Sequence, residues 1–269
     1  MIAKAFPNKR DEIVIATKVG YDFVTHGEAR GRGQREIPQD FSPDAIVRAT
    51  EAALKRLKTD RIDLLQLHNI RMEQVDDDAV WKTLEQLKGA GKIRYYGIAL
   101  DPPSAGCTKA STCIREREIT SMQHIYNMLE QHPGRAIHDA ATETGRRRCF
   151  SFACRIHPEC LRENTMPRRF SRRAIIARHR PRSWLLNGVK KIEQLRFSKM
   201  PIARLGQAAL QWLLADDRVA STLPNIYNEE QLIEFAKAPE YAAAHQRRYG
   251  THRGTLRREF RHRRGPAQV

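Results

Sequence analysis

Two long, strongly basic segments of the sequence lack lysine altogether. Residues 144–183 contain 12 Arg and 2 Glu, and residues 241–269 contain 8 Arg and 1 Glu, so together they carry the whole formal net charge of +17. The other 200 residues are balanced, with 28 basic and 28 acidic side chains, and they hold all 13 Lys. The basic segments also lack aromatic residues interleaved at stacking spacing. We therefore expect no specific nucleic-acid partner, and an Arg-rich polyanion or nucleic-acid binder is kept as an alternative.

The sequence also lacks long apolar runs. None approaches the ~20 residues of a membrane-spanning helix, and residues 1–12 lack the apolar core of a secretory signal. We therefore expect a cytoplasmic protein with no membrane partner.

Cysteine is missing from the well-patterned part of the sequence, and all five cysteines lie in irregular stretches. A disulfide framework is not expected in a chain of this length. Cys149, Cys154, His157 and Cys160 offer four soft ligands within twelve residues. Their spacing matches no common structural zinc site, so no metal site is predicted.

Two apolar segments each bring an ionisable side chain to the end of a predicted strand. Residues 13–19 (IVIATKV) carry Lys18 near their end, and residues 62–68 (IDLLQLH) end on His68. Residues 42–57 begin with Ser-Pro-Asp and continue with apolar residues at helical spacing, which predicts a capped helix. Polar groups at the carboxyl ends of buried parallel strands are what the active site of an α/β enzyme is built from.

The alternation of strands and helices continues along much of the chain. Strands are predicted over residues 92–100, within 118–128 and over 219–224; helices are predicted over residues 80–91, 131–145, 183–197, 203–215 and 228–238. This order is typical of βαβ units in a parallel sheet. The pattern fails near residues 101–113, 146–180 and 241–269. No helix is predicted over residues 101–113, and no strand is recognised around residues 149–156.

Four stretches, taken in order, resemble the aldo-keto reductase family of NAD(P)H-dependent (β/α)8 barrels. They are DEIVIATKVG, SPDAIVRATEAALKRLKTDRIDLLQLH, ITSMQHIYNMLEQ and GQAALQWLLADDRVASTLPNIYNEEQL, and with the intervening helices they cover roughly 190 residues. The resemblance implies an α/β fold, a TIM (β/α)8 barrel that is incomplete because its first strands are missing. Residues 1–240 would form this partial barrel, with an irregular Arg-rich insert over residues 146–180. Residues 241–269 would form a basic, disordered tail.

The resemblance also implies site residues. The family uses an Asp, Tyr, Lys and His tetrad, in which Tyr is the general acid and Lys favours its proton release. Lys18 matches the Lys and His68 matches the His, but the 17 residues before Lys18 supply neither the Asp nor the Tyr. Four further positions fall at the turn that holds the adenosine phosphate, and Gln123 matches the glutamine that contacts the nicotinamide. The turn positions are Pro224, Asn225, Asn228 and Gln231.

The implied function is hydride transfer between NAD(P)H and a small aldehyde or ketone, impaired here by the missing Asp and Tyr. A non-catalytic reductase fragment is the other alternative. The implied cofactor is NADP or NAD, with NADP placed slightly ahead, although Tyr227 stands where NADP-preferring members often have Arg. Nothing in the sequence sets the oligomeric state.

One hypothesis covers the three irregular stretches: they are translated from a shifted frame of a gene for an intact reductase. Such translation of a GC-rich gene gives Arg, Ala, Pro and Cys without periodicity and makes Lys scarce, as seen in residues 144–183 and 241–269. The nucleotide sequence is its test. Separately, the resemblance implies that the chain is truncated at its N-terminus.

Overall fold

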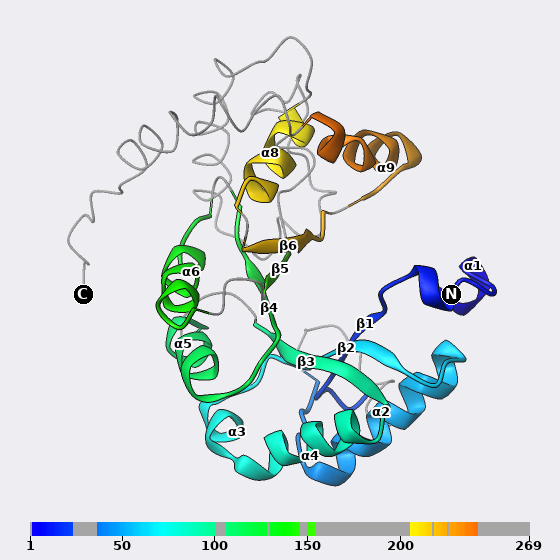
Figure 1. Cartoon of the computed structure of the whole chain (residues 1–269), viewed down its shortest axis with the longest axis vertical. Helices are drawn as coiled ribbons and strands as arrows, with labels where there is room; N and C mark the ends of the chain where they lie inside the picture. The colour runs from blue at the N-terminus through cyan, green and yellow to red at the C-terminus, as the bar shows by residue number, and fades with distance from the viewer. Residues whose placement is uncertain are drawn as a thin grey trace. The chain divides into compact units, whose positions relative to one another are not determined.

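The computed structural model describes residues 2–23, 37–100, 106–127, 130–145, 150–153, 205–216, 218–224 and 226–241 (Figure 1). The chain divides into two compact units: one of residues Met1–Tyr126 and Glu130–Ala153, the other of Asn127–Leu129 and Cys154–Val269. The predicted helix over residues 183–197, nearly all of the basic insert and tail, and the Cys/His cluster around residue 157 lie outside the described residues.

The first unit is built on a parallel sheet whose strands follow chain order. The strands are β1 (Ala16–Val19), β2 (Ile62–His68), β3 (Ile93–Ala99), β4 (Ser121–Ile125) and β5 (Phe150–Ala153). Each pairs with the next in parallel register. A parallel pair needs a crossover connection, and this need accounts for the helices between the strands.

Helices connect these strands and lie along one face of them (Figure 1). They are α2 (Pro43–Leu57), α3 (Met72–Asp76), α4 (Asp78–Gly89), α5 (Gly106–Glu116) and α6 (Gly134–Glu143), preceded by the short α1 (Ile2–Ala5) and the 3-10 turn η1 (Arg10–Glu12). Helix α2 begins as predicted, because the Ser42 hydroxyl accepts a hydrogen bond from the backbone N–H of Ala45 at 3.4 Å. The helix ends at Leu57 and is capped by Lys58, which adopts a left-handed conformation with φ of 53°.

The apolar core lies between this helical layer and the sheet. Side chains of alternate strand residues point to the helices, and the fully buried ones include Leu65, Leu67, Ile98 and Met122. Leu84, Ile114 and Ile137 of the helices are buried with them. The opposite face of the same strands carries Lys18, Gln66, His68 and Gln123.

Two stretches that the sequence pattern left unassigned are regular. Helix α5 occupies most of the stretch predicted to lack a helix, and Ala110, Cys113 and Ile114 on it are buried at helical spacing. Pro102 and Pro103 precede this helix and do not interrupt it. The shifted-frame hypothesis relied on the absence of an apolar period, but residues 106–116 have one. The strand not recognised around residues 149–156 is β5, which aligns Gln123 with Ser151.

The described part of the second unit contains α8 (Leu205–Leu214), β6 (Val219–Thr222), α9 (Glu229–Ala236) and the 3-10 turn η6 (Ala238–Tyr241), as the sequence predicts for residues 203–238. Amide side chains join these elements: Gln207 Nε2 donates to the Glu234 carbonyl at 3.0 Å, and Gln211 Nε2 to the Ala238 carbonyl at 3.1 Å. Across the described parts of both units, no helix has the length and apolar content needed to span a membrane.

Candidate active site

The register of the sheet places the predicted Lys18, His68 and Gln123 on one face. Lys18 aligns with Gln66 of β2, and His68 aligns with Ala99, which in turn aligns with Gln123. Residues two apart on a strand point to the same side, so Lys18 and His68 lie on the same face of adjacent strands. The spacing between strands and the rise per residue separate their Cα atoms by about 8 Å. Strands β1, β2 and β4 therefore present these side chains near their carboxyl ends, where active sites of α/β barrels form.

Lys18 lies half-buried on this face, and burial lowers the pKa of its ammonium because the charged form loses hydration. Among the described residues, no carboxylate forms an ion pair with it and no side chain accepts its hydrogen bond. The family pattern places an Asp beside this Lys, and the described residues contain no such partner. Within the described part of the chain, Lys18 is therefore a cationic group near the rim without a local counter-charge.

A layer of small and polar groups lies level with Lys18. Gln66 is 2% exposed, and its Nε2 donates to the Ser121 hydroxyl at 3.1 Å. Gly97 lies between them in register, and a Cβ built there would stand 2.1 Å from the Ser121 carbonyl oxygen. Only glycine therefore fits at this position, and its lack of a side chain lets the Gln66 amide reach across to β4.

His68 is held by residues that sequence reasoning did not select. The Tyr21 ring meets the His68 imidazole edge-on, with centroids 4.8 Å apart and an interplanar angle of 88°. Asn69 adopts a left-handed conformation with φ of 59°, and its Nδ2 donates to the Tyr21 hydroxyl at 2.8 Å. Gln39 Nε2 donates to the carbonyl of His68 at 3.0 Å. Asn69 could have been identified from the sequence as a polar residue directly after a strand that ends on His. Tyr21 lies in a loop without an apolar period, so the sequence did not point to it.

The predicted cofactor residues of the second unit serve the start of α9. Asn228 Oδ1 accepts from the backbone N–H of Gln231 at 2.9 Å, and Gln231 Oε1 accepts from the backbone N–H of Tyr227 at 2.9 Å. These bonds form a reciprocal helix cap. Pro224 lies in the preceding segment, partly buried, and Asn225 falls outside the described residues.

The residues present fit one end of a nicotinamide dinucleotide better than the other. Gln123 is partly exposed on the rim, and its amide offers the donor and acceptor that a nicotinamide carboxamide requires. By contrast, residues 219–236 contain no Lys or Arg, and α9 begins with Glu229 and Glu230. These carboxylates oppose a phosphate at that helix start.

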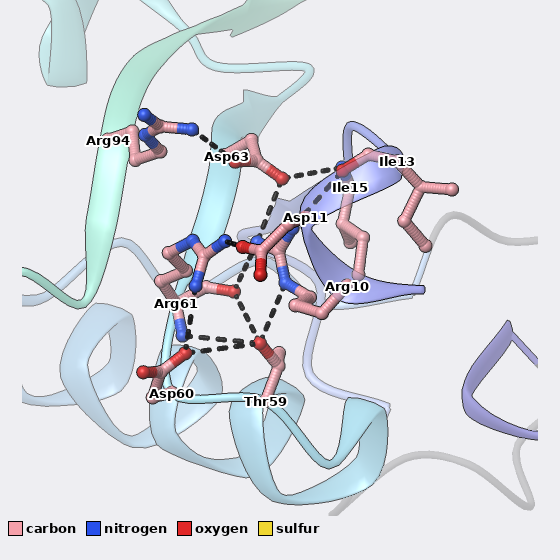
Figure 2. A network of polar contacts seen from close by, with 9 residues as sticks. All are labelled: Arg10, Asp11, Ile13, Ile15, Thr59, Asp60, Arg61, Asp63 and Arg94. Atoms are coloured by element: carbon pink, nitrogen blue, oxygen red, sulfur yellow. Dashed lines mark hydrogen bonds and ion pairs between the residues drawn. The ribbon is translucent and has the colours of Figure 1, made fainter. Parts of the chain in front are cut away.

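At the amino end of β2, a charged network fixes the segment that leads into β1 (Figure 2). The Asp63 carboxylate accepts from the Ile15 N–H at 2.8 Å and pairs with Arg10 at 2.8 Å and Arg94 at 3.3 Å. Burial raises the pKa of Asp63, but these donors outweigh burial and the net shift is downward. The network lies at the end of the strands opposite to Lys18 and His68, so we assign it to stability.

Comparison with known proteins agrees with this arrangement. The model of the Aldo/keto reductase family matches residues 1–244. The uncharacterized oxidoreductase YqkF of Bacillus subtilis is 31% identical over 133 residues, which are 49% of this chain and 40% of YqkF. L-glyceraldehyde 3-phosphate reductase of Escherichia coli K12 is 26% identical over 259 residues, which are 88% of this chain and 68% of that protein.

Solved structures give the same family. The holo form of the aldo-keto reductase AKR11C1 from Bacillus halodurans superposes with a TM-score of 0.70 at 26% identity, covering 95% of this chain and 76% of that one. The α/β barrel class predicted from the sequence is confirmed by this neighbour and by the parallel sheet. On the match over residues 1–244, this chain belongs to the aldo/keto reductase family.

Proposed function

We propose that this chain transfers hydride between a nicotinamide dinucleotide and a small aldehyde or ketone. The observation that carries the proposal is the placement of Lys18, His68 and Gln123 on one face of the parallel sheet, near the carboxyl ends of β1, β2 and β4, in a chain of this family. Two matched relatives are named as reductases of sugar-type carbonyls, L-glyceraldehyde 3-phosphate and 6-dehydroglucose. These names favour a short, hydroxylated aldehyde as the substrate class.

Each rim residue has a role that its chemistry supports. The reduced nicotinamide would supply the hydride, and the Gln123 amide would hold its carboxamide. Lys18 places a positive charge where negative charge develops on the carbonyl oxygen. The His68 imidazole offers a hydrogen-bond donor to the same oxygen. We expect NADP or NAD to serve as cofactor.

The test is cofactor binding together with turnover in the full chain. Titration of NADPH and NADH followed by protein fluorescence gives Kd, and loss of reduced-nicotinamide absorbance with glyceraldehyde gives kcat. Lys18→Met should lower kcat at least ~10-fold, because one positioned electrostatic group contributes on that order or more. Lys82→Met is the matched control, since Lys82 is exposed on α4. Cofactor binding without turnover would favour the non-catalytic fragment, and no cofactor binding would overturn the proposal.

A further inference from the structure

The surroundings of Lys18 differ from those of other lysines in the chain. Its side chain is half-buried on the sheet face that carries the candidate site, so it keeps contact with solvent. Several other lysines form ion pairs with glutamates: Lys9 with Glu12, Lys88 with Glu85 and Lys92 with Glu51. Within the described part of the chain, Lys18 has neither such a pair nor an acceptor for its hydrogen bonds. Its amine can therefore meet a ligand at this face.

Two carboxylates of the neighbouring segments are engaged away from Lys18. Asp63 lies near the amino end of β2, in the network with two arginines that Figure 2 shows. Asp40 accepts a hydrogen bond from the backbone N–H of Ser42 at 2.9 Å. Gln66, directly beside Lys18 in register, is neutral and donates its amide N–H to β4. Burial without a counter-charge lowers the pKa of Lys18, which enlarges the neutral share of its amine at a given pH.

A proton donor lies close to this amine. His68 is on the same face of the adjacent strand, two residues beyond the position that aligns with Lys18. The Tyr21 ring meets its imidazole edge-on, with ring centroids 4.8 Å apart. A desolvated lysine amine is a nucleophile toward carbonyl carbon, and an imidazole exchanges protons near neutral pH. Two neighbouring strands therefore present a nucleophile and a proton donor to one ligand.

We propose that the Lys18 amine captures short hydroxylated aldehydes as a Schiff base; the substrate class rests on the proposed function, whereas the reaction uses no nicotinamide. The Nζ lone pair forms a C–N bond with the carbonyl carbon, the C=O π electrons move to oxygen, and a proton passes from nitrogen to that oxygen. His68 then protonates the resulting hydroxyl, which leaves as water while the nitrogen lone pair closes the C=N bond. The remaining nitrogen proton returns to the imidazole. Amine and aldehyde thus become imine and water, without a change in oxidation state.

Capture and hydride transfer need opposite protonation states of Lys18. The proposed hydride transfer uses the charged ammonium, whereas formation of the C–N bond uses the neutral amine. A rise in pH therefore favours capture. Because the pKa of Lys18 is lowered, capture should reach half of its maximal rate at a lower pH than the same reaction at an exposed lysine.

Reductive trapping tests the proposal. The full chain is incubated without nicotinamide in glyceraldehyde and cyanoborohydride, which reduces an imine to a stable secondary amine, and peptide mass spectrometry gives the labelling rate of each lysine. We expect Lys18 to be labelled at least ~10-fold faster than the exposed Lys82, because a positioned proton donor contributes on that order or more. Its labelling should also reach half of its maximal rate at a lower pH. Equal labelling rates at the two lysines would overturn the inference.

His68→Phe separates a built site from a reactive surface lysine. The change keeps an aromatic ring beside Tyr21 and removes the proton donor, so labelling of Lys18 should slow at least ~10-fold while labelling of Lys82 stays the same. An unchanged Lys18 rate would overturn the inference. Labelling of Lys18 in a chain that does not oxidise NADPH or NADH would support capture and overturn the hydride transfer. Turnover without labelling of Lys18 would overturn capture alone.

Discussion

The backbone N–H of Ile15 donates a 2.8 Å hydrogen bond to the Asp63 carboxylate, and the Ile15 carbonyl accepts from the backbone N–H groups of Asp63 and Leu64 at 3.1 Å each. The contact joins residues 48 positions apart and fixes the start of the strand that carries Lys18. Figure 2 shows that the same carboxylate also pairs with two guanidinium groups, one on either side of it.

Replacing Asp63 with alanine should therefore destabilise the fold. The change leaves the Ile15 N–H and the Arg10 guanidinium without their buried acceptor, which costs roughly 3 kcal/mol of unfolding free energy. Urea denaturation measures this difference. Asp60→Ala is the control, because the Asp60 side chain is 84% exposed and its removal should cost less than ~0.5 kcal/mol. Equal effects of the two changes would contradict the structural role of Asp63.

Gly97 offers a prediction about packing beneath the site. Gly97→Ala would place a Cβ 2.1 Å from the Ser121 backbone oxygen, which cannot move without separating β3 from β4. We expect a loss of roughly 1–3 kcal/mol of unfolding free energy. Gly89→Ala makes the same chemical change at the end of α4, where nothing lies within 4 Å of the new Cβ. Thermal unfolding of both variants is the measurement, and similar melting temperatures would show that the close approach is wrong.

His124 makes stability dependent on pH. Burial lowers the pKa of its imidazole, and the neighbouring His138, with ring centroids 5.7 Å apart, lowers it further. The folded chain thus keeps His124 neutral, whereas the unfolded chain protonates it near pH 6.5. Its contribution to stability is complete above that pH and is lost as the pH falls below it toward the folded-state pKa.

Urea midpoints measured from pH 7.5 to 5 would reveal this slope. His124→Leu removes the titrating group, so its midpoint should depend less on pH across this range. His132→Gln is the control, because His132 is exposed. An equal pH dependence of the urea midpoint in His124→Leu and His132→Gln would contradict this role of His124.

On the proposed function, cofactor choice should depend on the charges near α9. Residues 219–236 contain no Lys or Arg, so the 2′-phosphate of NADPH gains no ion pair from them. We expect NADH and NADPH to bind with Kd values within a few-fold of each other. Tyr227→Arg should strengthen NADPH binding about tenfold, in a salt-dependent way, while leaving NADH unchanged. Leu232→Arg on α9 controls for added charge alone, and an equal gain in this variant would contradict the assignment of Tyr227 to the phosphate site.

The spacing of apolar residues in the sequence was enough to predict the helices and strands whose buried residues recur regularly. Residues 62–68 form β2 with the predicted bounds, because their apolar run lies between a helical cap and a polar end. Helix α5 was missed because its buried face is made of small residues, Ala110 and Cys113, and reaches Ile114 only after the stretch considered irregular. Residues 13–15 were predicted as strand, but β1 begins at Ala16, since Ile15 bonds to the Asp63 side chain.

The sequence predicted only those site residues that match the family pattern and lie on strands. Lys18, His68 and Gln123 were chosen from the sequence, and the sheet register brings them to one face. Tyr21 and Asn69 could not be paired in this way, because their hydrogen bond joins a loop to a strand end 48 residues apart. Asn228 and Gln231 were predicted as cofactor contacts, and in the structure they cap α9.

Transfer of an isotope label tests the central claim most directly. Glyceraldehyde is incubated with the full chain and with NADPH or NADH that carries deuterium in the transferable C4 position, and the alcohol product is examined by mass spectrometry. Our account predicts deuterium at the former carbonyl carbon with the unchanged chain and with Lys82→Met, and at least ~10-fold less with Lys18→Met. Label no higher than in a protein-free control would contradict it.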